Sequence, residues 1–244
     1  MRFGLQLSPP LSLALHARSQ IPADTIPQTS TLRAPTSTFS SSTTTTTTAA
    51  AAAAAMVSAL ILLAEGTEES EYTITYDVLV RGGVSVRSAL VPPCDSAYVT
   101  CSRGVRIVPD ISLPCPAEAV REYDALIIPG GAKGAETISS SSDVHALIKH
   151  MHDAGKVVGA ICAGSLAIQA AHLAPGAKIT SHPSVKSQLE SDYDYREERV
   201  VVSDRLITSR GPGTTFEFAL ALVTTLVGAS KAQEIAPPML LPSV

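Results

Sequence analysis

The sequence predicts an α/β fold in which a mostly parallel sheet is covered by helices on both faces. Apolar runs of strand length recur along the chain, most of them bounded by glycine or proline, and stretches of helical length separate them. Short buried strands that alternate with helices are typical of parallel sheets. The 244 residues, 45% hydrophobic and 16% charged, suffice for one domain or at most two.

The expected elements follow one another from residue 59 onward. In parallel sheets, ligand sites lie at the carboxyl ends of the strands, so the loops there are the first place to search for functional residues. Strands are expected at 59–63, 84–91, 125–128, 157–161 and 206–208, and helices at 143–154, 163–173 and 214–227.

Residues 1–55 differ in composition from the rest of the chain. They contain eight Ser and eleven Thr, a run of six Thr at 43–48 and a run of seven Ala at 49–55. Being acid-poor and containing arginine, they resemble a mitochondrial transit peptide; a disordered tail, or translated sequence upstream of a start at Met56, are the alternatives. We expect a low-complexity leader over 1–55 and a folded domain over 56–244, located in the cytoplasm, or in mitochondria if the leader is a transit peptide.

Composition and charge argue against several classes of function. The apolar stretch 49–64 has sixteen residues, whereas a membrane-spanning helix needs about 20, so we expect a buried strand there and no membrane span. The 18 basic and 22 acidic residues give a net charge of −4, which argues against binding to nucleic acid or an anionic membrane. The four cysteines show neither a C-x-x-C pair nor a close histidine, so neither zinc nor a disulfide framework is indicated, and a reducing compartment fits best.

Cys162 lies between an expected strand and an expected helix, in the segment Ala-Ile-Cys-Ala-Gly. A nucleophile on such a sharp turn occupies strained backbone and needs small residues two positions before and after it, a need that Ala160 and Gly164 meet. The free N–H groups of the following helix favour a thiolate and lower the thiol pKa. We therefore predict that Cys162 is a reactive nucleophile; a buried structural cysteine is the alternative.

A glycine turn, Pro129-Gly130-Gly131, ends the expected strand at 125–128. Glycines let backbone N–H groups approach a reacting oxygen, so this turn and the N–H of Ala163 are candidates for an oxyanion hole. Such a sequence is also typical of a simple turn. It is not a phosphate-binding loop, because the G-x-x-x-x-G-K-[ST] spacing is absent.

Titratable side chains follow two other strands. Residues 65–71 contain four glutamates, at least three of which are expected on a solvated helix start; if one turns inward beside Cys162, the carboxyl and the thiol titrate as a coupled pair. His182 follows a short strand around Ile179 and is a candidate catalytic residue at the same sheet edge. The histidines at 145, 150 and 152 are expected on a solvated helix face and lack carboxylates at metal-ligand spacing.

The segment 209–217 combines a Gly-x-Gly sequence with a helix start. A dinucleotide-binding fingerprint fails here, because Phe216 occupies the third glycine position and no strand with a terminal acid follows. Thr214 and Glu217 are instead expected to form a capping box. No nicotinamide, metal or other cofactor is expected.

Taken together, these motifs resemble the ThiJ/PfpI superfamily and, within it, the DJ-one branch, the group of the Parkinson-associated deglycase. The resemblance implies a flavodoxin-like three-layer α/β sandwich with a cysteine nucleophile elbow, assembled as a homodimer. The matching pieces, from residue 57 to about 240, are LLAEGTEESE, CSRGVRIVPDISL, YDALIIPGG, AICAG, SHP and LITSRGPGTTFEFALALV.

The resemblance also implies roles for individual residues. Cys162 matches the reactive cysteine and Glu71 matches the carboxyl that hydrogen-bonds it. Cys101 matches a second, oxidisable cysteine near the dimer interface, and Val108 replaces a further family cysteine. The other matches are the oxyanion-hole N–H donors of Gly131 and Ala163, the nearby histidine at His182, and two arginines of an anion-binding pocket at Arg81 and Arg103.

The chain departs from the family pattern beside the nucleophile. Ala163 stands where peptidase-like members carry histidine, which argues against a Cys-His protease. Ser165 replaces the proline that is typical of this elbow, and Ser70 replaces a hydrophobic residue before the glutamate. The late His-x-Glu of cysteine glutaminases is absent.

Two functions remain open. The resemblance implies a cofactor-independent glyoxalase that converts methylglyoxal or glyoxal into a 2-hydroxy acid, with related deglycation of glyoxal adducts on protein or nucleotide, in the response to oxidative and carbonyl stress. The alternative is a non-catalytic redox sensor or chaperone that acts through oxidation of Cys162. A reactive thiolate serves both roles, so measured turnover has to separate them.

Overall fold

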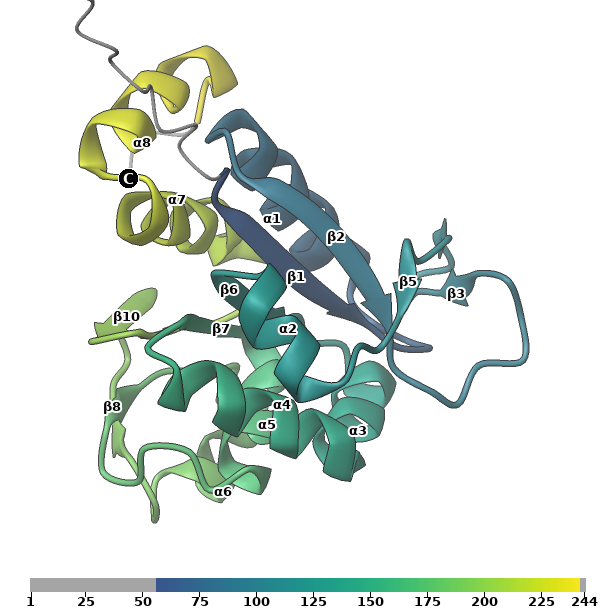
Figure 1. Cartoon of the computed structure of the whole chain (residues 1–244). Coiled ribbons are helices and arrows are strands. Elements are labelled where there is room, and N and C mark those ends of the chain that lie inside the picture. Colours follow the sequence, from purple (N-terminus) through teal and green to yellow (C-terminus); the bar gives the residue numbers. More distant parts are fainter. Residues whose placement is uncertain (1–55, 242–244) are drawn as a thin grey trace, which may run out of the picture. The chain divides into compact units, whose positions relative to one another are not determined.

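The computed structural model describes residues 56–241, which are built around a seven-stranded sheet. The strand order is β10-β11-β7-β6-β1-β2-β5, and every neighbouring pair is parallel except β10 with β11 (Figure 1). The mostly parallel sheet expected from the sequence is therefore confirmed. Its strands are β1 (Ser58–Leu63), β2 (Ser85–Leu90), β5 (Ile111–Ser112), β6 (Ala125–Ile128), β7 (Val157–Ile161), β10 (Val200–Ser203) and β11 (Leu206–Ser209).

Two short strand pairs lie outside this sheet. The antiparallel pair is β3 (Val99–Thr100) with β4 (Arg106–Ile107), which frames the loop after Cys101. The parallel pair is β8 (Lys178–Ile179) with β9 (Asp194–Tyr195), and the chain reaches His182 directly after β8. Both pairs therefore shape loops beside the sheet rather than extending it.

Helices cover both faces of the sheet, as the alternating pattern predicts (Figure 1). Helices α1, α7 and α8 pack together on one face, and α2 to α5 pack on the other. The helices are α1 (Glu69–Arg81), α2 (Pro116–Glu122), α3 (Ala132–Ser140), α4 (Ser142–Asp153), α5 (Ser165–Ala170), α6 (Lys186–Leu189), α7 (Thr215–Leu226) and α8 (Ala229–Ile235).

Strand β1 shows how the sequence builds two cores. Successive strand residues point to opposite faces, so Leu60 and Leu62 pack with α4 and α5, while Ile61 and Leu63 pack with α1 and α7. Both sets are fully buried. A strand with two buried faces reads as a continuous apolar run, which is why the expected and observed bounds of this strand agree to one residue.

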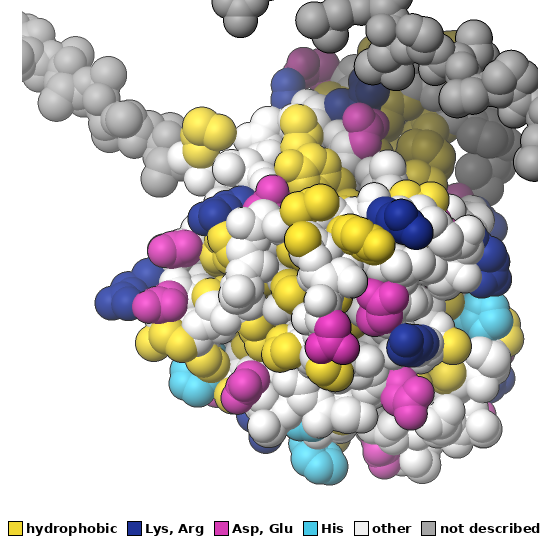
Figure 2. Space-filling view, turned by 90° about the vertical axis from the view of Figure 1, so that its right-hand side faces the viewer, with side chains coloured by type: hydrophobic (Ala, Val, Ile, Leu, Met, Phe, Trp, Pro, Cys, Tyr) yellow, Lys and Arg dark blue, Asp and Glu magenta, His cyan; other side chains and the backbone are white. Residues whose placement is uncertain are grey.

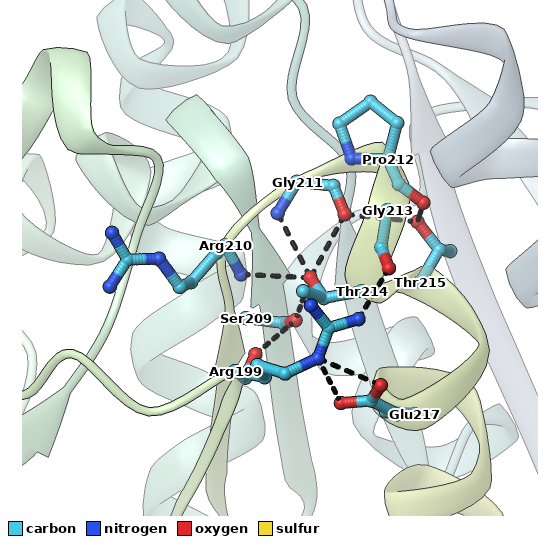
Figure 3. A network of polar contacts seen from close by, with 9 residues as sticks. All are labelled: Arg199, Ser209, Arg210, Gly211, Pro212, Gly213, Thr214, Thr215 and Glu217. Atoms are coloured by element: carbon cyan, nitrogen blue, oxygen red, sulfur yellow. Dashed lines mark hydrogen bonds and ion pairs between the residues drawn. The ribbon is translucent and has the colours of Figure 1, made fainter. Parts of the chain in front are cut away.

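Two local expectations are wrong. The helix expected at 163–173 is shorter, because the chain first forms a 3-10 turn over Cys162–Gly164 and α5 then ends at Ala170. The capping box of Thr214 and Glu217 does not form: the hydroxyl of Thr214 accepts from the N–H groups of Arg210 and Gly211, and Glu217 pairs with Arg199 at 2.8 Å (Figure 3). These contacts brace the turn between β11 and α7.

The face that carries β3 and β5 mixes hydrophobic side chains with acidic and basic ones (Figure 2). Val108, at the position of the missing family cysteine, is exposed.

Within residues 56–241, no helix has the length and apolar character needed to cross a membrane. The expected leader over 1–55 lies outside the described residues, and its role stays a prediction.

Candidate active site

Cys162 occupies a sharp turn directly after β7. Its φ is 63°, a left-handed conformation that is uncommon for a residue with a side chain. Ile161 before it is still extended, and Ser165 after it is helical. This strand-turn-helix geometry is the nucleophile elbow expected from the sequence, and the side chain of Cys162 is half-buried.

Glu71 reaches the elbow from the first turn of α1. Its side chain is completely buried, and Oε2 accepts a hydrogen bond of 2.7 Å from the N–H of Gly130. Oε1 is buried and has no N–H or O–H donor. The neighbouring polar group is the thiol of Cys162, and the interaction between the two groups shifts both pKa values. One glutamate of the acidic segment therefore does turn inward.

Gly130 and Gly131 allow these groups to approach one another. A Cβ on Gly130 would lie 2.7 Å from the Cβ of Cys162 and 2.8 Å from Oε2 of Glu71. Gly131 has a φ of 92°, and a Cβ there would lie 2.3 Å from the carbonyl oxygen of Gly66. Side chains at either position would collide with fixed atoms, so the glycine turn is a requirement of this arrangement.

The acid and the thiol strongly affect each other's ionisation. Burial raises the pKa of Glu71 to about 7. The contacts with Gly130 and Cys162 lower this pKa, but burial outweighs them. Burial and the carboxylate of Glu71 raise the pKa of Cys162 to about 12, whereas the N–H groups of Ala163 and Gly131 lower it. The expected lowering of the thiol pKa is therefore wrong: the N–H groups act in the expected direction, but burial and the carboxylate outweigh them.

Protonation of Glu71 changes this balance. A neutral carboxyl carries no charge to repel a thiolate and can donate a hydrogen bond to it, and hydrogen bonding to an ionised form favours that form. Two interacting sites of this kind titrate as a pair rather than as separate groups. The nucleophilic form of the pair is the tautomer in which the carboxyl holds the single proton and the sulfur is a thiolate.

Cys162 opens onto a pocket of about 450 Å³. Its walls come from loops at the carboxyl ends of β1, β6, β7 and β11 and from the segments after β3 and β8, which is the expected edge of a parallel sheet. The lining residues are Glu68, Ser102, Arg103, Gly131, Ala132, Cys162, Ala163, Leu166, His182, Ser184, Val185 and Pro212.

His182 and Arg103 both border this pocket, as predicted. The N–H of His182 donates to the carbonyl oxygen of Cys162 at 3.3 Å, and its Nδ1 lies 2.8 Å from the hydroxyl oxygen of Ser184. The imidazole is largely exposed to solvent. Arg103 is also exposed, and its guanidinium donates to the carbonyl oxygen of Ser102 at 3.2 Å.

Within a single chain, Arg81 does not line this pocket. It is the last residue of α1, whereas Glu71 lies in the first turn of that helix. A rise of about 1.5 Å per residue separates the two by about 15 Å along the helix axis. Arg81 is exposed and forms an ion pair with Asp77 at 2.7 Å, one turn earlier.

Glu69 is a buried residue that the sequence argument missed. It was expected to be solvated, yet its carboxylate accepts from the hydroxyl of Ser102 at 2.8 Å and from the N–H groups of Arg103 at 2.8 Å and Val105 at 3.4 Å. Although burial raises the pKa of Glu69, these hydrogen bonds lower it overall. Glu69 therefore holds the turn that carries Arg103.

Cys101, expected as a second oxidisable cysteine, is buried under the same acidic segment. Burial raises the pKa of its thiol to about 11, and the charges of Glu69, Glu68 and Glu65 add to this effect. Thiolate is the reactive form, and this shift keeps the thiol of Cys101 protonated at neutral pH. Among the described residues, no group of three or more His, Cys, Asp or Glu side chains is arranged to hold a metal ion.

The fold and the site define a class: α/β proteins that carry a cysteine on a nucleophile elbow with a buried carboxyl beside it. The DJ-1/PfpI family matches residues 57–225, and the chain belongs to this family. It is 45% identical to Protein DJ-1alpha of Drosophila melanogaster over 75% of this chain and 83% of that protein. It is 42% identical to the glutathione-independent glyoxalase DJR-1.2 of Caenorhabditis elegans, over 75% of this chain and 96% of that protein.

Solved structures show the same similarity. The crystal structure of Drosophila melanogaster DJ-1beta aligns with a TM-score of 0.71 at 39% identity, and covers 77% of this chain and 100% of that chain. The Schizosaccharomyces pombe DJ-1 structure aligns with a TM-score of 0.72 at 32% identity, over 76% of this chain and 100% of that chain. The resemblance and the α/β sandwich expected from the motifs are confirmed.

Proposed function

We propose that this protein is a glutathione-independent glyoxalase that adds one water molecule to methylglyoxal or glyoxal and forms the corresponding 2-hydroxy acid. The observation that carries the proposal is the buried pair of Glu71 and Cys162. It combines a nucleophile for the aldehyde with a carboxyl whose pKa, raised to about 7, suits a proton shuttle at neutral pH. Two relatives, from Caenorhabditis elegans and Schizosaccharomyces pombe, are named glutathione-independent glyoxalases.

The proposed reaction begins from the tautomer of the pair in which Glu71 holds the proton and Cys162 is a thiolate. The Cys162 thiolate attacks the aldehyde carbon, a C–S bond forms, and the carbonyl oxygen becomes an oxyanion. The N–H groups of Gly131 and Ala163 stabilise this oxygen until Glu71 gives it a proton. The result is a hemithioacetal, with Glu71 now ionised.

Glu71 then moves a proton between the two substrate carbons. It removes the proton from the former aldehyde carbon to give an enediolate, and returns a proton to the neighbouring carbon. As the hydroxyl proton passes from the first oxygen to the second, a thioester of the 2-hydroxy acid remains on Cys162. One water molecule hydrolyses this thioester, which releases the acid and restores the thiol, with no external oxidant or reductant.

The remaining pocket residues take supporting roles in this proposal. His182 assists the proton transfers from the pocket wall, and the charge of Arg103 favours the oxyanion and the enediolate that form in the pocket. The same chemistry extends to deglycation of early glyoxal adducts, in which the aldehyde carbon is still reactive. We also propose that the protein works as a homodimer and acts in the cytoplasm, or in mitochondria if residues 1–55 direct it there.

Lactate formation from methylglyoxal by the purified protein, without glutathione, tests the proposal. We expect turnover by the wild type and by Cys115→Ala, and none by Cys162→Ser. Equal loss in Cys115→Ala would show that the nucleophile is wrongly assigned. No lactate from a wild type whose Cys162 is readily alkylated would reject the enzyme and favour the redox sensor.

A further inference from the structure

A hydroxyl group is buried directly behind the nucleophile. Ser165 is the first residue of α5, and its side chain has no exposed surface. Its Oγ donates a hydrogen bond of 3.2 Å to the carbonyl oxygen of Thr180. A buried polar group without a partner is destabilising, and this bond satisfies both groups. It also ties the elbow to the segment that follows β8.

That segment leads directly to His182. The N–H of Thr180 donates to Oγ1 of Thr208 on β11 at 2.9 Å, and the N–H of His182 donates to the carbonyl oxygen of Cys162 at 3.3 Å. Residues 180–182 are thus held by three hydrogen bonds, to Thr208 on β11, to the main chain of Cys162 and to the side chain of Ser165. Ser165 contributes a side-chain bond between the elbow and this segment.

The elbow itself needs support from its surroundings. A non-glycine residue in a left-handed conformation is strained and persists only where neighbouring contacts hold it. Cys162 is in this conformation, and Ser165 lies one turn later. Removing the hydroxyl of Ser165 therefore loosens the segment that carries His182 from the elbow that carries the thiol.

We propose that Ser165 is a positioning residue that sets His182 relative to the thiol of Cys162 through its bond to Thr180. Ser165 does not line the pocket and touches no substrate. Its effect on turnover rests on the proposed function. Its effect on the reactivity of Cys162 does not, and is measurable by alkylation with iodoacetamide.

The test is a double-mutant cycle of Ser165→Ala with His182→Ala, measured on kcat for methylglyoxal and on the rate of Cys162 alkylation. We expect Ser165→Ala to lower kcat about tenfold or more with little change in KM, because small misplacements of reacting groups cost rate. Ser165→Thr, which keeps the hydroxyl, should recover most of the loss. In the His182→Ala background, Ser165→Ala should have no further effect on either readout.

Tyr193→Phe is the matched control. It removes another buried hydroxyl that donates to a main-chain carbonyl, that of Leu173 at 2.8 Å, and Tyr193 does not line the pocket. We expect near-normal kcat and alkylation from this variant. If Ser165→Ala behaves like Tyr193→Phe, or if its effect simply adds to that of His182→Ala, the proposal is wrong.

Two outcomes need a further experiment: a wild type without lactate production and a Ser165→Ala variant that does not fold. If the wild type makes no lactate, the proposed function fails, but the alkylation cycle still decides the role of Ser165. If Ser165→Ala does not fold, Thr208→Val loosens the same segment from β11. In that case the proposal requires that Thr208→Val also slows Cys162 alkylation and that His182→Ala abolishes this effect; an unchanged rate overturns it.

Discussion

The carboxyl of Glu71 and the thiol of Cys162 meet beside the bare Cα of Gly130. The N–H of Gly130 donates to one carboxylate oxygen at 2.7 Å, while the other oxygen is buried without an N–H or O–H donor. The glycine therefore orients the acid and leaves space for the sulfur. The approach of these two groups depends on this one missing side chain.

Gly130→Ala should disrupt the pair. The new Cβ would lie within 3.0 Å of Cys162, Glu71 and the main-chain nitrogen of Ala163, so the acid and the elbow must move apart. We expect aldehyde turnover to fall by about 10² or more, the usual contribution of a positioned acid or base. Gly213→Ala, where a Cβ has open space, is the control and should retain activity. Comparable turnover in the two variants would contradict the arrangement.

Glu71→Gln should remove a pH-dependent loss of stability. Because burial raises the pKa of Glu71 from 4.5 to about 7, the folded protein binds more protons than the unfolded chain between these values. Wild-type stability should therefore fall as pH rises through this window. When the folded and unfolded pKa values differ by one, the free energy of unfolding changes by about 1.4 kcal/mol, and 1 kcal/mol moves Tm by about 2–4 °C in a domain of this size.

Melting curves from pH 4 to 8 check this expectation. Tm of Glu71→Gln should exceed that of the wild type by several degrees at pH 8 and approach it at pH 4. The exposed Glu136→Gln variant should follow the wild type throughout. Parallel curves for Glu71→Gln and the wild type would show that the carboxyl is ionised without penalty.

The two arginines should behave differently. Arg103→Ala removes a cation from the pocket wall, so we expect a several-fold higher KM for aldehydes that carry a carboxylate or phosphate. Arg81→Ala breaks an exposed pair with Asp77, a contact usually worth at most about 1 kcal/mol. It should leave KM unchanged. Steady-state kinetics of the two variants decide this, and an equal effect of Arg81→Ala would restore its expected place in the pocket.

A protein of residues 56–244 should match the full chain in Tm and aldehyde turnover. Residues 1–55 have no apolar periodicity, and the first strand of the fold begins at Ser58. Thermal melting and lactate assays of the two forms provide the comparison. A loss of more than a few degrees would mean that the leader contributes to folding.

Strands and the nucleophile were predictable because their signals are local. The apolar runs of β1, β6 and β7 indicate strands buried on both faces, and the small residues around Cys162 indicate a tight turn. A local pattern can also give a wrong prediction. Thr214 and Glu217 have the spacing of a capping box, but the carboxylate of Glu217 forms an ion pair with Arg199 instead. The ion pair joins residues that only the fold brings together.

Contacts between residues far apart in the sequence explain why the burial of Glu69 and the pKa of Cys162 differ from the expectations. Glu69 and Glu71 share one acidic segment, and nothing local indicates that Glu69 accepts from a turn more than 30 residues away. The pKa of Cys162 was mispredicted for the same reason, since the helix N-terminus is visible in the sequence whereas the buried charge of Glu71 is not. Arg81 is assigned by resemblance, and the direction of α1 places it at the opposite end of that helix from Glu71.

The central claim is that Glu71 moves protons for a nucleophilic Cys162, and Glu71→Gln tests it most directly. Glutamine preserves the shape and can still donate a hydrogen bond to the thiolate, but it cannot accept and return a proton. We predict that lactate production falls by about 10² or more, while the rate of Cys162 alkylation by iodoacetamide changes much less. Near-normal lactate production, or an equal fall in alkylation and turnover, would contradict the account.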